Sequence, residues 1–379
     1  MADGSKIEWT NATWNPVTGC TVLSPGCTNC YAQRLAGTRL RDHPSRAGLT
    51  KDSKAGPVWT GEVRFNKAWL PQPLGWARPR RIFVCAHGDL FHHGVPDEWI
   101  DAVFSVMERC PHHTFQILTK RAERMHRYVS KRHRDAAPLP HVHLGVSVED
   151  QARADERLPY LVMTPAAVRF ISYEPALGPL DLRSIPMQGM FPNLPEFHRY
   201  DVLRGGTWTH QGFGFVNHSD MSGHLIHQVI FGGESGPGAR PAHPDWARHK
   251  RDECEAAGAA FFFKQHGSWV DHTQLAEPAN AWDRTSKDGA SPTVGKLFRS
   301  KRGGIVPLLG GREVETAWPF GHPSCVHECV LSGRCKSTPG GPTVLKLEVT
   351  ALTARRRGEQ PEANRQSVGI RTRFGRADW

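Results

Sequence analysis

The sequence predicts an α/β protein built on a partial (β/α) TIM-like barrel, followed by a C-terminal extension. Short apolar runs alternate with segments of helical periodicity, which is typical of right-handed βαβ units and a parallel sheet. With a weak strand before Cys20, this alternation gives seven strands. Polar residues or glycines follow each apolar run directly, as expected for a barrel with a site ringed by the carboxyl ends of its strands. A doubly wound sheet fits the strand count but would concentrate such residues at one switch point, so we favour the barrel.

The first half of the barrel begins with the weak strand before Cys20, a helix at 31–40 and a polar loop that reaches residue 80. Residues 81–85 form a short apolar run typical of a buried strand. The helix at 97–110 begins at Pro96-Asp97 and repeats its apolar residues at helical spacing. A strand at 114–118, a helix at 121–130 and a strand at 142–148 complete this half.

The second half continues with a helix at 151–163, which contains Pro159, and a strand at 168–172. A stretch rich in glycine, proline and histidine follows, and we expect an insertion at about 180–226. The last units are a strand at 227–231, a helix at 245–257 that Gly258 ends, and a strand at 259–263. The barrel domain is expected to cover residues 1–318.

The extension at 319–379 combines a group of soft ligands with a basic tail of weak fold signal, which we expect to be disordered. So many soft ligands in a short span can close a zinc site or ligate a second iron–sulfur cluster. The candidate ligands of this second metal site are Cys325, His327, Cys329 and Cys335.

Composition indicates a cytoplasmic protein with a polyanionic partner and excludes a membrane protein. No run approaches the roughly 18 apolar residues of a membrane span, and the N-terminus lacks the apolar core of a signal peptide. The 379 residues carry a net charge of +11, which favours nucleic acid, although a solvated helix face is the alternative. The densest basic segment contains Lys120, Arg121, Arg124, Arg127, Lys131, Arg132 and Arg134.

Three of the nine cysteines form the most informative motif in the chain. Cys20, Cys27 and Cys30 have the spacing Cys-x6-Cys-x2-Cys, with no fourth cysteine in the next fifty residues. A structural zinc site closes with four ligands, and an electron-transfer [4Fe–4S] cluster normally takes four thiolates. Three thiolates hold a cubane cluster and leave one iron open for a small molecule. A zinc site completed by a distant histidine is the alternative.

The strand ends supply carboxylates and cations that we expect to meet at the barrel mouth. Several such groups at one opening suit a polar substrate. Salt bridges between Asp89, Glu149, Glu174 or Glu234 and the nearby Lys120, Arg121 or Lys264 are the competing interpretation. The strand-end clusters are Gly88-Asp89, Thr119-Lys120-Arg121, Ser147-Val148-Glu149, Ser172-Tyr173-Glu174-Pro175, Gly232-Gly233-Glu234-Ser235-Gly236 and Lys264-Gln265-His266.

The chain resembles the radical-SAM superfamily, and more closely a bacteriophage-associated family of radical-SAM-like proteins of largely unassigned function. The resemblance covers roughly residues 6–318. It departs from the superfamily pattern in the x6 spacing, where x3 is usual, and in a Gly-Gly-Glu that follows the sixth strand instead of the second. The matching stretches are Ile7-Glu8-Trp9-Thr10, Thr13 to Cys20, Ser24 to Ala32, Leu118-Thr119-Lys120-Arg121, Gly145 to Glu149, Glu174-Pro175, Gly232 to Gly236 and Phe262-Phe263-Lys264-Gln265.

This resemblance implies a [4Fe–4S] cluster on Cys20, Cys27 and Cys30, with S-adenosylmethionine on the open iron. Reductive cleavage would give a 5′-deoxyadenosyl radical, with flavodoxin or ferredoxin as the electron donor. By position in the fold, Asp89 would meet the methionine amino group and Ser147 and Glu149 the ribose, while Gly232 and Gly233 would let the backbone approach the adenine or the substrate. The expected substrate-binding residues are Lys120, Glu174, Glu234 and Lys264.

The expected substrate is a nucleic acid, because of the positive charge and the implied phage association. DNA base modification or lesion repair, similar in chemistry to spore photoproduct lyase, ranks ahead of RNA modification. If the chain is phage-encoded, its place is the cytoplasm of the bacterial host. The alternative is a metal-stabilised phage protein that binds nucleic acid without catalysis.

Overall fold

A computed structural model describes residues 7, 9–187, 199–208, 215–217 and 224–271, together with short strands at 297–299, 308–309 and 312–313. The chain divides into two units, residues 1–334 and 335–379, and every described residue belongs to the first. The predicted domain boundary at 318 lies outside the described residues. So do the four candidate ligands of the second metal site, Cys325, His327, Cys329 and Cys335.

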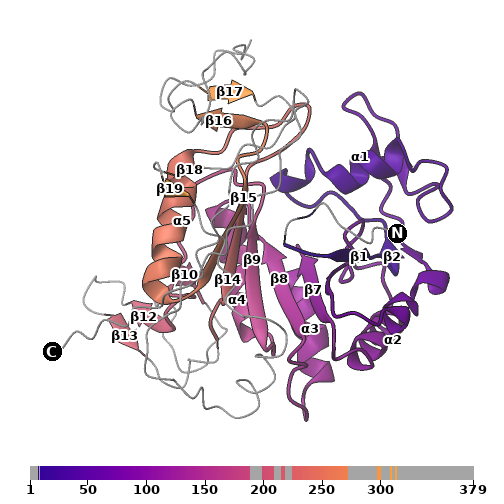
Figure 1. The fold of residues 1–379 in the computed structure, drawn as a ribbon, viewed down its shortest axis with the longest axis horizontal. Coiled ribbons are helices and arrows are strands. Elements are labelled where there is room, and N and C mark those ends of the chain that lie inside the picture. The colour runs from indigo at the N-terminus through magenta and orange to yellow at the C-terminus, as the bar shows by residue number, and fades with distance from the viewer. Residues whose placement is uncertain are drawn as a thin grey trace, which may run out of the picture. The chain divides into compact units, whose positions relative to one another are not determined.

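The core element is a seven-stranded parallel sheet whose spatial order follows the chain order (Figure 1). Because the order never reverses, the sheet has no switch point, and the doubly wound alternative is wrong. β1 and β15 are its two edges, so the sheet is an open half-barrel, in agreement with the predicted α/β architecture. The strands are β1 (Ala12–Trp14), β6 (Arg81–Val84), β7 (Thr114–Thr119), β8 (Val142–Ser147), β9 (Val168–Tyr173), β14 (Gln228–Gly232) and β15 (Ala260–Gln265).

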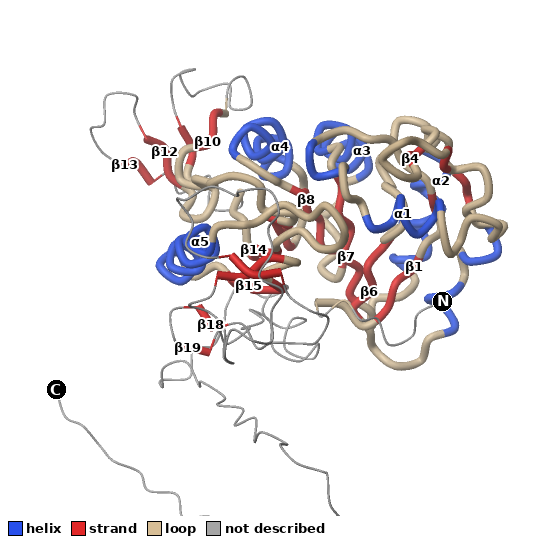
Figure 2. The backbone as a smooth tube through the Cα atoms, turned by 90° about the horizontal axis from the view of Figure 1, so that it is seen from above, coloured by secondary structure: helices blue, strands red, loops and turns tan. Residues whose placement is uncertain are grey.

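Helices follow β6, β7, β8 and β14 and lie along the outer side of the curved sheet, as Figure 2 shows for α3, α4 and α5. Every second residue of the strands faces them, and the two layers share one large apolar core. Asp150 begins α4 by accepting a hydrogen bond from the Arg153 backbone N–H, and Gly258, at φ 71°, ends α5. The helices are α2 (Asp97–Glu108), α3 (Ala122–Arg132), α4 (Gln151–Met163) and α5 (Pro244–Ala257).

The other residues of the strands face the inner side, where they form a second, smaller apolar cluster. Phe83, Phe170, Ile230 and Phe262 come from four different strands and pack together beneath Trp9. Full burial of such a side chain stabilises a fold by about 1.5–3 kcal/mol. Apolar side chains therefore fill part of the inner side of the half-barrel, and the polar residues follow at the carboxyl ends of the strands.

Several short elements differ from the predictions because they are too brief to produce a periodic pattern. The first helix, α1 (Tyr31–Gly37), ends three residues before the predicted end at 40. The polar loop up to residue 80 holds a small hairpin, β3 (Thr50–Lys51) with β4 (Val58–Trp59), and the strand β5 (Arg64–Phe65), which pairs with β2 (Val17–Thr18) from before α1. It also holds the 3₁₀ turns η2 (Lys67–Trp69) and η3 (Gln72–Gly75), whereas the 3₁₀ turn η1 (Pro25–Cys27) precedes α1.

The predicted insertion between β9 and β14 contains a four-stranded antiparallel sheet of its own. Its strands are β10 (Ile185–Pro186), β11 (Arg199–Tyr200), β12 (Gly206–Trp208) and β13 (Phe215–Asn217). Two further antiparallel pairs follow β15, formed by β16 (Trp269–Asp271) with β17 (Leu297–Arg299) and by β18 (Leu308–Leu309) with β19 (Arg312–Glu313). In the described part of the chain, no helix has the length and apolar character needed to cross a lipid bilayer.

Candidate functional site

The three cysteines lie on one loop, residues 19–30, which we call the cysteine loop. It leaves the carboxyl end of the first strand at Gly19, which bridges to Gly88 at the end of the neighbouring strand. Gly19 has φ 96°, and a Cβ there would stand 2.2 Å from the carbonyl oxygen of Glu62. Only glycine fits this close backbone approach, so the direction of the loop is set at its first residue.

The thiols of the cysteine loop are shielded from water. Cys27 is buried, and Cys20 and Cys30 are half-buried against an apolar cluster formed by α1 and the hairpin that follows it. Burial raises the pKa of Cys20 to about 12 and also raises the pKa of Cys30. Thiols with raised pKa values are poor nucleophiles, whereas a bound metal takes the place of the proton. The raised pKa values argue against thiol catalysis, and a metal bound here would have to displace the thiol protons.

Arg121 connects the cysteine loop with the end of β6. Its Nη1 donates to Asp89 Oδ2 at 2.7 Å and to Cys20 Sγ at 3.6 Å. Asp89 is buried, and its other oxygen accepts hydrogen bonds from Thr119 Oγ1 at 2.7 Å and from the Phe91 N–H at 3.0 Å. These partners satisfy the carboxylate within the protein. The predicted contact between Asp89 and the methionine amino group stays a prediction.

Glu149, just after β8, lies directly beneath the cysteine loop. Its Oε1 accepts a hydrogen bond from Ser24 Oγ at 2.6 Å and lies 3.5 Å from Lys120 Nζ. Its Oε2 accepts from Arg157 Nη1 at 2.9 Å, and both side chains are buried. A Cβ on Gly26 would stand 2.4 Å from Glu149 Oε1. The loop therefore rests on this carboxylate, and its predicted contact with a ribose is not tested by these interactions.

Glu234, after β14, holds the cysteine loop from the other side of the mouth. It accepts hydrogen bonds from Asn29 Nδ2 at 2.9 Å and from Arg240 Nη2 at 2.6 Å. Arg240 in turn donates to the Pro25 carbonyl oxygen at 2.9 Å. Burial acts to raise the pKa of Glu234, but the hydrogen bonds from Arg240 and Asn29 outweigh it and leave the pKa below its usual value. The loop is thus attached to both halves of the sheet.

The remaining predicted substrate residues, Glu174 and Lys264, form an ion pair of 2.5 Å across β9 and β15. Both side chains are about one-fifth exposed, so the pair lies at the surface of the mouth. Tyr31 is 54% exposed, and its hydroxyl donates to the Ala86 carbonyl oxygen at 2.6 Å. Together these groups offer a polar and aromatic surface to a substrate.

The glycines and the serine predicted to meet the cofactor are enclosed by protein. A Cβ on Gly233 would stand 1.8 Å from the His266 carbonyl oxygen, and one on Gly232 would meet Glu174. Ser147 is buried and lies beside Ser172 in the parallel register. Gly232 and Gly233 therefore permit a close approach of other segments of this chain. The predicted approach of their backbone to the adenine or the substrate stays a prediction.

The ion pairs between strand ends, left open by the sequence, are present in the structure. Asp89 pairs with Arg121, Glu149 with Lys120 and Arg157, and Glu174 with Lys264, whereas Glu234 pairs with Arg240. In the described part of the chain, no group of three or more His, Cys, Asp or Glu side chains forms a ready site for a metal ion. The cluster assignment therefore depends on the chemistry of the three thiols.

Three residues of this network were missed by the sequence analysis. Arg157 lies on the buried face of α4, at helical spacing between Ala154 and Leu161. A charged residue among the apolar positions of a helix is rarely buried without a partner, and this pattern could have identified Arg157 from the sequence. Arg240 and Asn29 lie in loops. Their contacts join segments about 200 residues apart, and no local pattern indicates such a contact.

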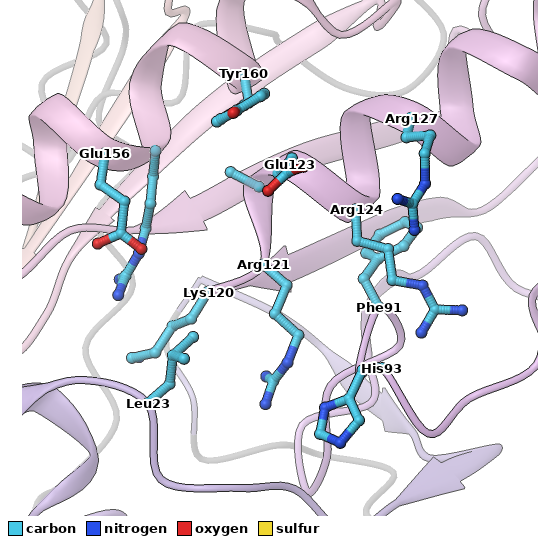
Figure 3. A pocket seen from close by; sticks show the side chains of 12 residues that line it. Leu23, Phe91, His93, Lys120, Arg121, Glu123, Arg124, Arg127, Glu156 and Tyr160 are labelled. Atoms are coloured by element: carbon cyan, nitrogen blue, oxygen red, sulfur yellow. The ribbon is translucent and has the colours of Figure 1, made fainter.

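The predicted basic segment is partly used inside the protein. Arg132 pairs with Asp101 and Glu108, and Arg124 donates to the carbonyl oxygens of His92 and Val95. Four side chains of the segment, Lys120, Arg121, Arg124 and Arg127, border a cavity of about 350 Å³ next to the cysteine loop (Figure 3). Its charged or titratable lining residues are His93, Lys120, Arg121, Glu123, Arg124, Arg127, Glu156 and Arg157.

One family model matches most of the chain. The family, described as a protein of unknown function (DUF5131), matches residues 4–315, so the chain belongs to the DUF5131 family. No curated protein and no solved structure gave a significant match. Any functional conclusion must therefore come from the site itself.

Proposed function

We propose that this member of the DUF5131 family is a radical-SAM-type enzyme that acts on a nucleic acid, with DNA ahead of RNA. Cys20, Cys27 and Cys30 would hold a [4Fe–4S] cluster that binds S-adenosylmethionine. The proposal is carried by one observation: the loop with the three cysteines lies over the carboxyl ends of a parallel half-barrel and is attached to polar residues after β6, β8 and β14. A barrel carries its chemistry at this end of its strands.

The protein's own residues would hold the cofactor and exclude water. When bound and reduced, the cluster and S-adenosylmethionine supply an organic radical that abstracts hydrogen from the substrate. Arg121 would orient Cys20 and keeps a positive charge beside its sulfur, which partly offsets the burial that raises the pKa of Cys20. Glu149 and Glu234 fix the loop from below and from the far side. The half-buried Glu174 and Lys264 and the exposed Tyr31 would contact the substrate.

The second candidate function is nucleic-acid binding by a metal-stabilised phage protein without catalysis. It is favoured by the network of ion pairs, which accounts for the strand-end carboxylates without a substrate. In that case the three thiols would hold zinc with a further ligand, and neither an electron donor nor S-adenosylmethionine would be needed. The two proposals differ in redox chemistry, so one experiment separates them.

The deciding experiment is anaerobic reconstitution of the full chain with iron and sulfide. We expect a brown, oxygen-sensitive protein whose absorption bleaches on reduction and which then releases 5′-deoxyadenosine from S-adenosylmethionine. Cys27→Ala should lose both properties. Cys110→Ala, which removes a buried cysteine at the end of α2, is the matched control and should retain them. A redox-silent protein with bound zinc, or no 5′-deoxyadenosine from a loaded cluster, would refute the enzyme proposal.

The substrate class needs a separate measurement. Mass spectrometry of DNA and RNA nucleosides from cells with and without the protein should show a nucleoside whose amount depends on Cys27. A difference confined to RNA would correct the ranking of the two nucleic acids. No difference in either would remove nucleic acid from the proposal while leaving the cofactor chemistry in place.

A further inference from the structure

The basic cavity lies where the start of α3, the face of α4 and the cysteine loop meet (Figure 3). Leu23 of the cysteine loop lines it, and so does Ala122, the first residue of α3. Five arginine or lysine side chains border the cavity against two glutamates. The excess of positive charge is therefore concentrated within reach of the proposed cofactor site.

The lining cations are only partly neutralised by neighbouring carboxylates. Arg121 is paired with Asp89. Lys120 and Arg157 share the single carboxylate of Glu149, so one positive charge of this buried group is in excess. Arg127 is exposed and forms no ion pair with any described residue. Arg124 is paired with Asp97 and Glu156 with Arg153, so Arg127 and one charge of the Lys120 and Arg157 group remain against the exposed carboxylate of Glu123.

Arg157 is the strongest indication that the cavity takes a ligand. Its side chain is 1% exposed, and only Nη1 is used, donating to the Ser147 carbonyl oxygen at 2.8 Å and to Glu149 Oε2 at 2.9 Å. Nε and Nη2 are buried and donate to no described group, and Arg157 is one of the residues that line the cavity. Buried N–H donors of a cation are costly to leave without an acceptor.

The start of α3 adds backbone donors to the same place. No side chain caps this eleven-residue helix, whose N-cap residue Arg121 is turned toward Asp89. An uncapped helix start presents free N–H groups and a partial positive charge. Guanidinium forks and helix starts both favour the oxygens of a phosphate group. The two features are independent and point to the same ligand chemistry.

We propose that this cavity binds a backbone phosphate of a nucleic-acid strand, with Arg157, Lys120 and Arg127 as the contacting cations. Phosphate binding itself needs no cluster, whereas the identification of the strand as substrate rests on the proposed function. A phosphate held here would lie beside the cysteine loop, since Leu23 borders the cavity and Arg121 reaches Cys20. An adjacent nucleotide could then enter the barrel mouth.

The test uses the full chain, without reductant or S-adenosylmethionine, and a fluorescent single-stranded DNA whose anisotropy reports binding. Arg127→Ala should weaken binding about tenfold and reduce the slope of its salt dependence by about one. Arg134→Ala is the matched control, because Arg134 is an equally exposed arginine just beyond α3 that does not line the cavity. Equal losses in the two variants would refute a specific site.

Arg157→Lys tests the buried contact with the charge retained. A lysine keeps the attraction to Glu149 but loses the planar fork, so we expect about tenfold weaker binding with an unchanged circular dichroism spectrum. Wild-type affinity in this variant would overturn the role of Arg157. Because the assay requires no cluster, retained binding in a protein that forms no 5′-deoxyadenosine would reject the enzyme proposal and leave the phosphate site standing.

Competition separates a strand from a small phosphate compound. Inorganic phosphate and a mononucleotide should displace the DNA only at concentrations far above that of an unlabelled strand. If instead phosphate stabilises the wild-type protein, but not Arg157→Lys, and the DNA does not compete, the cavity serves a small phosphorylated molecule. That result would overturn the assignment to a nucleic-acid strand.

Discussion

Gly26→Ala is the sharpest single perturbation of the candidate site, because it adds one methyl group against a buried carboxylate. The new Cβ would stand 2.4 Å from Glu149 Oε1 and 2.5 Å from its Cγ. Carbon atoms in contact are normally about 3.5–4.0 Å apart, so either Glu149 or the cysteine loop must move by roughly 1 Å. Glu149 is fully buried and cannot move into water.

The cost follows from the hydrogen bonds that such a movement breaks. Glu149 accepts from Ser24 at 2.6 Å and from Arg157 at 2.9 Å, and each bond to a charged group contributes about 1.5–3 kcal/mol. Allowing for partial relaxation, we expect the free energy of unfolding to fall by about 2–4 kcal/mol. In a unit that spans residues 1–334 each kcal/mol shifts Tm by about 1–2 °C, so this corresponds to a fall in Tm of about 2–8 °C.

The assay is thermal unfolding of the reduced protein, followed by circular dichroism. Gly75→Ala is the matched control, because a Cβ at Gly75 meets no atom within 4 Å and its φ is not positive. It should melt like the wild type. A Gly26→Ala protein that also melts like the wild type would show that the cysteine loop does not rest on Glu149, and the site geometry would have to be revised.

Two further predictions concern the far side of the loop and the response to acid. Glu234→Gln weakens the charge-assisted bonds from Arg240 and should lower the free energy of unfolding in urea by about 1–3 kcal/mol; a loss no larger than that of the exposed Glu98→Gln would count against this attachment. Burial, with a smaller effect of His112, lowers the pKa of His113 to about 4. Because the unfolded state then binds the proton first, the stabilising contribution of His113 is complete above about pH 6.5 and is lost toward about pH 4. The decrease in Tm from about pH 7 to about pH 5 should be smaller in His113→Phe than in the wild type or His112→Phe, and equal decreases would contradict the assignment.

The strands and helices of the barrel could be predicted because their patterns are local. Apolar runs at 81–85, 114–118 and 142–148 coincide closely with β6, β7 and β8, since a strand buried on both faces needs apolar residues throughout. Short elements such as β2 and β3 were missed, because a strand of two residues contains no period. The small sheet within the insertion was missed for the same reason, because its strands are only two or three residues long.

The sequence by itself determined the donor set of this protein: three thiols after the first strand and a charged group after each later one. The positions of these residues along the chain are enough to bring them to one edge, because consecutive parallel strands must end at the same edge of the sheet. Only the tertiary structure decided how those charges are partnered. Arg157 reaches Glu149 from inside a helix, and Arg240 and Asn29 meet at Glu234 across about 200 residues. Such pairs depend on distances in space, which the order of residues along the chain does not contain.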